Sequence, residues 1–370
     1  MLFEPYQLQS KRVPNRIWAQ SMEINSADAR GGVTPRVVER YAALADGGWG
    51  AVSVEAISVT GESLARSRGL VLDRKNLDGF KRLVEAFRAK SESALLIFQL
   101  SHSGRQSGAF SRRVKAFGAE DDGIPVLGEA DLRRIEEEFI DAARLAREAG
   151  ADGVDIKACH GYLLGEFLRP SNDRDDTYGG TRENRARLIT NVIGGVSGEM
   201  PGFIAGSRVS LYEGIRGGCG TAAADEVVED LDDMTGIISL MVKAGASFIN
   251  VSAGIPAVTP HITRPVKANS FFLYYHFRYA KLIRDRFPGV AVVGSAYSAG
   301  GERSLDWAGE NIRKGYADFA GFGRQTLADP RFPAKALDAP DSIRFCTLCG
   351  GCSTLLKNQQ EVYCSFYEKK

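Results

Sequence analysis

Short apolar stretches recur along the chain, and each follows a more polar stretch that ends near a glycine. The clearest are residues 50–57, 151–157, 247–252 and 317–322. A glycine suits the left-handed cap that ends a helix, and the Val- and Ile-rich residues after it are typical of a buried strand. The repeated pattern therefore predicts helices that alternate with parallel strands.

Four more apolar stretches, 16–21, 94–100, 203–211 and 290–294, bring the strand candidates to eight. Between two of these candidates, apolar residues of 132–149 recur every three or four positions, which predicts an amphipathic helix. Eight strand–helix units predict an α/β fold, a (β/α)8 TIM barrel. The alternative is an open doubly wound sheet, but such a sheet favours a glycine-rich turn after its first strand, and this sequence has none there.

Composition excludes some classes of partner. The chain has 370 residues and a formal net charge of +1, so charge gives no reason to expect nucleic acid or an anionic membrane as partner. No run of 18 apolar residues exists, and the first residues contain no apolar signal segment. We therefore expect a cytoplasmic protein, whose clustered cysteines bind metal or act in catalysis rather than form disulfides.

Two cations occupy positions that face the interior of the predicted barrel. By the alternation of strand side chains, Lys157 on the fourth strand and Arg208 on the fifth point inward. His160 and Tyr162 follow the fourth strand at the end where such barrels carry their active sites. An inward cation is costly unless it meets a charged ligand or a partner. A binding site and an internal salt bridge, for instance between Lys157 and Asp155, both remain open.

Two strand ends near the C-terminus have the features of anion sites. The segments VVGSAYS (292–298) and GFGRQTLADP (321–330) each place a glycine between a strand and a helix. Backbone N–H groups at such junctions bind phosphate, and Arg324 adds positive charge. The alternative is that Gly294 and Gly323 only make tight turns. Because phosphate sites of this fold commonly lie at strands seven and eight, we favour an anion site.

Four of the six cysteines lie within FCTLCGGCSTLLKNQQEVYC (345–364). Their spacing is C-x2-C-x2-C-x11-C. Three close thiols and one distant thiol suit an iron–sulfur cluster. Structural zinc sites usually pair two C-x2-C units, so zinc is the rival interpretation. Cys159 and Cys219 remain, and Cys159 is expected to be a small buried thiol.

The stretch HGYLLGEFLRPSNDRDDTYGGTRENRARL (160–188) resembles the most characteristic motif of the Old Yellow Enzyme family, the FMN-dependent NADH:flavin oxidoreductases. The segments PNRIWAQSM (14–22) and QLSHSGRQ (99–106) resemble the family as well. The cysteines resemble those of its iron–sulfur branch, which includes 2,4-dienoyl-CoA reductase, 2-enoate reductase and trimethylamine dehydrogenase. The resemblance implies an FMN-binding barrel over residues 1–340 and a [4Fe–4S]-binding segment over residues 341–370.

The resemblance also implies roles for single residues. Tyr162 matches the family's proton donor, and His160 matches a residue that hydrogen-bonds the substrate's carbonyl. Lys157 stands where many members have His, and it could hold a carboxylate or an enolate. The implied cofactor-binding residues are Met22, Ala56, Gln99, Arg208, Ser252, Gly294, Ser295, Gly323 and Arg324. The implied cluster ligands are Cys346, Cys349, Cys352 and Cys364.

The implied function is an ene-reductase that reduces the C=C bond of a small α,β-unsaturated carbonyl or carboxylate compound. The cluster would feed electrons to FMN from a separate flavoprotein or ferredoxin, or NAD(P)H would reduce FMN directly. One alternative is an amine dehydrogenase or demethylase that passes electrons out through the cluster. Another is an electron-transfer subunit or a zinc-stabilised binding protein with an inactive site. A homo-oligomer is left open.

The other histidines receive weaker predictions. His102 and His261 are expected to line the pocket, whereas His276 is expected in the core or on a helix surface.

Overall fold

Eight parallel strands close into a barrel in the computed structural model, which describes residues 1–119, 122–265 and 270–368. The ring closes because β3 pairs in parallel with both β11 and β4. A two-residue strand, β5 (Leu70–Val71), extends β4 at the side. The predicted (β/α)8 barrel is therefore confirmed, and each predicted strand range overlaps one barrel strand. These strands are β3 (Ile17–Ala19), β4 (Ala51–Ser58), β6 (Leu95–Ser101), β7 (Gly153–Ala158), β8 (Ile204–Ser210), β9 (Phe248–Ser252), β10 (Ala291–Gly294) and β11 (Phe319–Phe322).

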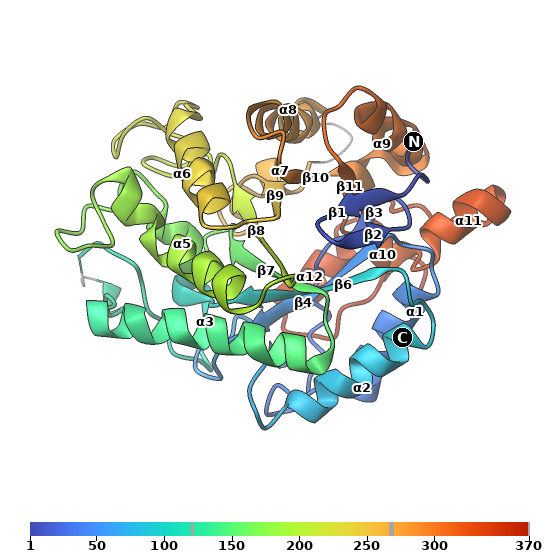
Figure 1. Cartoon of the computed structure of the whole chain (residues 1–370), viewed down its shortest axis with the longest axis horizontal. Coiled ribbons are helices and arrows are strands. Elements are labelled where there is room, and N and C mark those ends of the chain that lie inside the picture. Colours follow the sequence, from blue (N-terminus) through green and yellow to red (C-terminus); the bar gives the residue numbers. More distant parts are fainter. Residues whose placement is uncertain (120–121, 266–269, 369–370) are drawn as a thin grey trace.

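Helices surround the ring (Figure 1). The longer ones are α1 (Pro35–Ala45), α2 (Leu77–Arg88), α3 (Glu129–Ala149), α5 (Arg182–Glu199), α6 (Asp232–Lys243), α8 (Ser270–Arg286) and α9 (Ser304–Arg313). The shorter ones are α4 (Leu163–Phe167), α7 (Pro260–Thr263), α10 (Gln325–Ala328), α11 (Phe332–Asp338) and α12 (Gly351–Lys357). Local sequence determines where several of these helices begin or end. Thr34 and Thr181 cap α1 and α5 by accepting a backbone N–H, and Gly150 ends α3 at φ 96°.

One end of the barrel is closed by a hairpin that the sequence patterns did not predict. It consists of β1 (Tyr6–Leu8) and β2 (Lys11–Val13), and it lies in front of the strands in Figure 1. Leu8 and Val13 pack into a small core inside the barrel that includes Trp18, Phe248 and Phe319. The indole of Trp18 lies 5.1 Å from the ring of Phe248 and 5.2 Å from that of Phe319. This end therefore holds a packed core.

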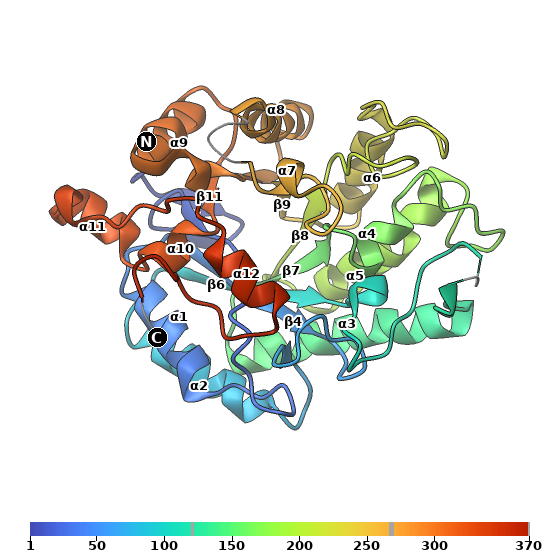
Figure 2. The ribbon, with the colours of Figure 1, turned by 180° about the vertical axis from the view of Figure 1, so that it is seen from behind.

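The opposite end is crossed by the cysteine-bearing segment. Figure 2 shows α12 lying over this end of the barrel. Beyond α12, Val362 N donates to Ile24 O at 2.9 Å, and Asn25 Nδ2 donates to Gln360 O at 3.2 Å. The segment is thus attached to the loop that follows β3. The division into residues 1–340 and 341–370 remains a prediction.

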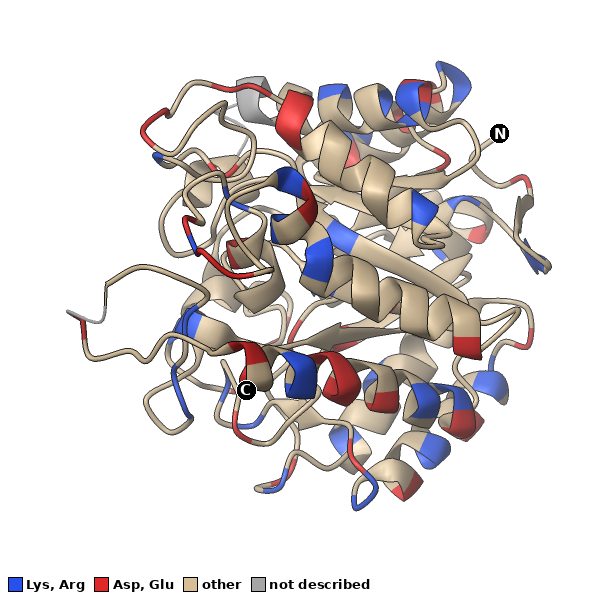
Figure 3. Ribbon diagram, turned by 60° about the vertical axis from the view of Figure 1, so that its left-hand side comes forward, with Lys and Arg blue, Asp and Glu red and all other residues tan. Residues whose placement is uncertain are grey.

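Charges of both signs are interspersed along the outer helices (Figure 3). On α3, Arg133 pairs with Glu129 at 3.1 Å and Arg134 pairs with Glu138 at 2.8 Å. Within the part of the chain that is described, no helix has both the length and the apolar character needed to cross a membrane.

Candidate active site

A cavity of about 310 Å³ lies at the C-terminal ends of the strands. Three α12 residues, Ser353, Leu356 and Lys357, form part of its wall. Most of the predicted site residues line it, namely Met22, Gln99, Lys157, His160, Tyr162, Arg208, Ser295, Gly323 and Arg324. Three others lie just outside its lining: Ala56 is buried on β4, and Ser252 and Gly294 end β9 and β10. The strand ends therefore bring together residues that are up to three hundred positions apart in sequence.

A buried hydrogen-bond network forms the floor of the cavity. Gln99 Nε2 donates to Asp155 Oδ2 at 2.9 Å, and Asn250 Nδ2 reaches the same oxygen at 3.3 Å. Gln20 Nε2 donates to Asn250 Oδ1 at 2.9 Å and to Ser295 Oγ at 2.7 Å. The network joins residues on or directly after five strands, β3, β6, β7, β9 and β10, and fixes the side chains at the strand ends. Gln20 and Asn250 were not predicted, although Asn250 faces inward beside Arg208 by strand register.

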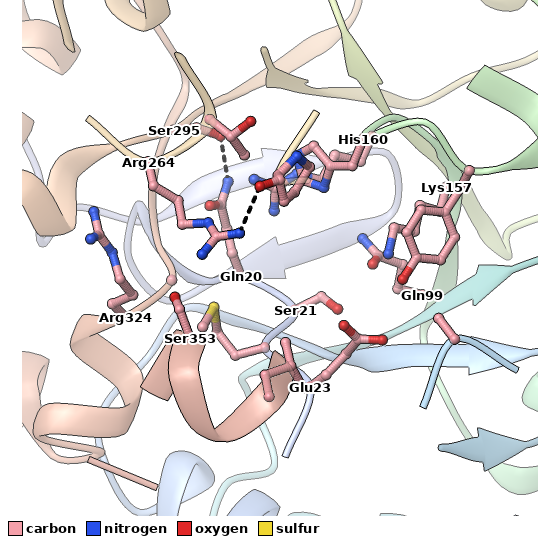
Figure 4. A pocket seen from close by; sticks show the side chains of 18 of the residues that line it. Gln20, Ser21, Glu23, Gln99, Lys157, His160, Arg264, Ser295, Arg324 and Ser353 are labelled. Carbon is pink, nitrogen blue, oxygen red and sulfur yellow. Dashed lines mark hydrogen bonds between the residues drawn. The ribbon is translucent and has the colours of Figure 1, made fainter. Parts of the chain in front are cut away.

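The inward cations lack acidic partners. In the described ranges neither Lys157 nor Arg208 makes an ion pair, so the salt bridge between Lys157 and Asp155 that the sequence left open does not form. Lys157 Nζ lies 3.4 Å from the centroid of the Tyr162 ring. Figure 4 shows Lys157 close to Gln99 in the cavity. Arg208 Nη2 lies 3.5 Å from Ser252 Oγ, while its Nε is buried without a hydrogen-bond partner. Buried donors of this kind suit an acceptor supplied by a ligand.

His160 is held in an unusual backbone conformation at φ 63°. Its backbone N–H donates to Ser210 Oγ at 3.1 Å, and its Nε2 lies 2.8 Å from Ser252 Oγ. Burial, followed by the positive charges of Arg208 and Lys157, holds the pKa of His160 well below its usual value. The imidazole is therefore neutral at pH 7 and offers one N–H donor.

An ion pair flanks Tyr162 on the cavity wall. Arg66 Nη2 lies 3.2 Å from Glu23 Oε2. Burial would raise the pKa of Glu23, but the charges of Arg66 and Lys157 outweigh it and lower that pKa. Burial and the charge of Glu23 raise the pKa of Tyr162, so this phenol is protonated at neutral pH. Arg66 lies in an irregular loop, and no sequence pattern pointed to it.

The other histidines agree with the predictions only in part. His276, expected in the core or on a helix surface, is buried and lines the cavity. Its Nε2 lies 2.9 Å from Ile262 O, and its Nδ1 is buried without a partner. Because a carbonyl only accepts, Nε2 carries the proton, and burial lowers the pKa to about 4. The prediction that His102 and His261 line the pocket is wrong, because neither belongs to the cavity wall. His102 Nδ1 accepts from Gly104 N at 3.2 Å, and His261 is exposed on α7.

One observation of the cavity fits flavin mononucleotide. The unpartnered Arg208 Nε would donate to an acceptor on the flavin ring. At Gly323, a Cβ would lie 3.1 Å from Met22 Sδ. At Gly294, a Cβ would lie 3.2 Å from the hydroxyl of Tyr297. Both glycines therefore sit where larger residues would crowd the strand ends beside Arg324.

The four clustered cysteines are free thiols, and Cys352 is next to Ser353 of the cavity wall. In residues 1–119, 122–265 and 270–368, no group of three or more His, Cys, Asp or Glu side chains is placed to hold a metal ion. The donor type fits an iron–sulfur cluster or zinc, but the sulfurs are not gathered around one point. Gln325 anchors the segment, because its Oε1 accepts from Cys346 N and its Nε2 donates to Arg344 O, both at 2.9 Å.

Comparison with known proteins identifies relatives along the whole chain. Residues 1–339 match the family described as NADH:flavin oxidoreductase / NADH oxidase. The chain is 30% identical over 367 residues to an NADH oxidase of Thermoanaerobacter brockii, a match that covers 95% of this chain and 53% of the relative. It is also 30% identical over 347 residues to the NADPH dehydrogenase of Bacillus subtilis (strain 168), covering 90% and 94% of the two chains.

A structure of 2-naphthoyl-CoA reductase in complex with 2-naphthoyl-CoA has the same fold, with a TM-score of 0.84 and 21% identity. The match covers 98% of this chain and 56% of the other. This chain therefore spans about half the length of that reductase and of the Thermoanaerobacter oxidase.

Proposed function

This chain belongs to the NADH:flavin oxidoreductase / NADH oxidase family, and from that premise we propose that it is an FMN-dependent ene-reductase. Its substrate would be a small α,β-unsaturated carbonyl or carboxylate compound. The observation that carries the proposal is the convergence of Tyr162, His160, Lys157 and Arg208 on one cavity. FMN, when bound, would supply the hydride that reaches the β-carbon of the alkene.

Residues of the chain would stabilise the negative charge that develops on the substrate and would supply the proton. Negative charge builds on the carbonyl oxygen, where the neutral His160 offers an N–H donor and Lys157 offers a positive charge. Tyr162 would then protonate the α-carbon. Its raised pKa keeps it protonated at neutral pH, and the ammonium of Lys157 above its ring favours the phenolate left behind. Gln99, Arg208, Gly323 and Arg324 would hold the cofactor, with Met22, Ala56, Ser252, Gly294 and Ser295 around them.

The cysteines would hold a [4Fe–4S] cluster at Cys346, Cys349, Cys352 and Cys364. Two observations support this assignment. All four are free thiols, and Gln325 holds the backbone of Cys346 in place at the start of the run. Burial raises the pKa values of Cys346 and Cys352, and the charge of Arg324 opposes that rise. Zinc remains the rival. Iron, acid-labile sulfide, zinc and flavin analysis of protein purified without oxygen separates them, since four irons and four sulfides per FMN support a cluster.

The family points to NAD(P)H as the reductant of FMN. A separate flavoprotein or ferredoxin acting through the cysteines is the alternative electron donor. Oxidation of an amine is the less favoured function, because Lys157, Arg208 and Arg264 line the same cavity and would repel a substituted ammonium.

Replacement of Tyr162 by Phe tests the proposal. The variant should still be reduced by NAD(P)H but should reduce the alkene at least about tenfold more slowly, which corresponds to ~1.4 kcal/mol in the barrier. Anaerobic stopped-flow absorbance separates these two half-reactions. Tyr274→Phe, at an exposed position on α8, is the control. An unchanged rate of alkene reduction in Tyr162→Phe would remove this residue from the mechanism.

A further inference from the structure

The ion pair between Glu23 and Arg66 lies on the cavity wall that also carries Tyr162. Arg66 Nε and Arg66 Nη2 each lie 3.2 Å from Glu23 Oε2. Both contacts use one carboxylate oxygen, so the other, Oε1, can accept from a further donor. Figure 4 shows Glu23 among the side chains that line the cavity. The carboxylate is therefore held by a cation while it still faces the site.

The backbone beside both members of this pair is anchored. The residue after Glu23 donates its N–H to Glu55 Oε2 at 2.9 Å. The residue after Arg66 donates its N–H to Gln359 Oε1 at 2.9 Å, and Gln359 Nε2 donates to Ala65 O at 3.3 Å. These contacts need no ligand. The pair is therefore fixed before a substrate binds, as a group that positions another residue must be.

The hydroxyl of Tyr162 lies between charges of opposite sign. Lys157 Nζ lies 3.4 Å from the centroid of the Tyr162 ring, and a hydrogen bond from Lys157 acts on the phenol. Burial would raise the pKa of Glu23, but neighbouring positive charges and a hydrogen bond from Tyr162 lower it. Because an ammonium only donates and a carboxylate only accepts, the phenol O–H is directed at Glu23.

The charge of Glu23 opposes that of Lys157 at the phenol. Burial, followed by the charge of Glu23, raises the pKa of Tyr162, whereas the charges of Lys157 and then Arg66 lower it. With Lys157 alone, the ammonium would favour a phenolate, which has no proton to donate. The positive charge of Arg66 in turn keeps Glu23 ionised.

We propose that Glu23 is a positioning residue for the proton donor: held by Arg66, its carboxylate fixes the hydroxyl of Tyr162 on the cavity wall and balances the charge of Lys157. This inference rests on the proposed function, in which Tyr162 Oη gives its proton to the α-carbon. The phenolate left behind regains a proton from water. Glu23 acts through Tyr162 and exchanges no proton with the substrate.

The titration of Tyr162 tests the proposal without relying on turnover. The holoprotein is prepared with tyrosine labelled by 13C at Cζ, and Tyr162→Phe identifies the Tyr162 resonance. In Glu23→Gln this resonance should titrate at least about one pH unit lower than in wild type, because the opposing charge is lost. Glu23→Asp, which keeps the charge, should recover most of the shift. Glu39→Gln, at an exposed position on α1, is the control.

A kinetic measurement separates this inference from the proposed function. In Glu23→Gln, the single-turnover rate of alkene reduction should fall at a lower pH than in wild type, whereas reduction of the protein by NAD(P)H should stay within about twofold. An unchanged Tyr162 titration in Glu23→Gln overturns the inference, whatever the rates are. A shifted titration with an unshifted rate profile would contradict the proposed function, since Tyr162 would then not be the proton donor. If Glu23→Gln does not fold, Arg66→Gln tests the same balance, and its Tyr162 resonance should titrate at a higher pH; an unmoved or lowered titration there would also overturn the inference.

Discussion

The charged side chains on the cavity wall determine which ligands the cavity favours. Lys157, Arg208 and Arg264 line it without acidic partners in the described ranges, whereas Arg66 is neutralised by Glu23. In the proposed site Arg208 would face the flavin ring, which leaves Lys157 as the cation beside Tyr162 for the substrate. Its position next to Tyr162 places that charge where the reacting double bond would lie. We therefore expect Lys157 to decide much of the substrate class.

Lys157→Gln tests this assignment by comparing two substrates. The variant should lose at least about tenfold in kcat/KM for an α,β-unsaturated carboxylate relative to the matching ketone, because only the carboxylate needs the full positive charge. Steady-state kinetics with both compounds provides the ratio. Lys90→Gln, at an exposed position after α2, is the control. Equal losses for the two substrates would show that Lys157 acts on Tyr162 or on the fold instead.

At the scale of elements, the segment after β3 links the barrel to the C-terminal region. Ile24 N donates to Glu55 Oε2 at 2.9 Å, and Ile24 O accepts from Val362 N at 2.9 Å. The same segment carries Met22 and Glu23, which line the cavity. The fully buried Glu55 thus holds one wall of the site in place.

The stability of this segment should depend on pH through Glu55. Burial raises the pKa of Glu55 from 4.5 to about 7, so the folded state binds its proton more tightly than the unfolded state. Its contribution to the free energy of unfolding is then fully present below pH 4.5 and is lost as the pH rises towards 7. Glu55→Gln should reduce the change in the free energy of unfolding between pH 5 and pH 8 by about 2–3 kcal/mol. Denaturant unfolding across this range measures it, with the exposed Glu85→Gln as control. Parallel curves for wild type and Glu55→Gln would refute the coupling.

At the scale of the whole molecule, α12 joins two sites. It carries Cys352 within the cysteine cluster and Ser353, Leu356 and Lys357 on the cavity wall. A metal bound by the cysteines should fix α12 over the cavity. By linkage, metal and FMN should then strengthen each other's binding by the same factor.

Metal removal tests this reciprocity. Chelation of the metal should weaken FMN binding by roughly fivefold or more, and removal of FMN should weaken metal binding equally. Equilibrium titrations of FMN into metal-loaded and metal-free protein, and of the metal with and without FMN, give both factors. The same titration with riboflavin, which lacks the phosphate of FMN, shows whether the effect depends on that phosphate. Independent affinities would mean that α12 keeps its position without a metal.

The sequence predicted what strand alternation and composition control. The inward positions of Lys157 and Arg208 follow from the period of two along buried strands, and the ring of strands follows from the repeated pattern. The hairpin β1–β2 was missed because its three-residue strands expose most of their side chains. The core position expected for His276 is confirmed, but its apolar neighbours in the sequence hide that it also meets the cavity. The contacts of α12 depend on long-range packing, which no local pattern encodes.

Closure of the ring also bears on how the protein folds. Strand β3 pairs with β4 on one side and with β11 on the other. The hydrogen bonds on one side of β3 therefore cannot form until residues 319–322 are available. The loop after β3 then receives Val362. Contacts of such long sequence separation form late and slowly. The cavity wall is therefore among the last parts to be completed, and a nascent or truncated chain that lacks β11 would expose the apolar edge strands β3 and β10 to aggregation.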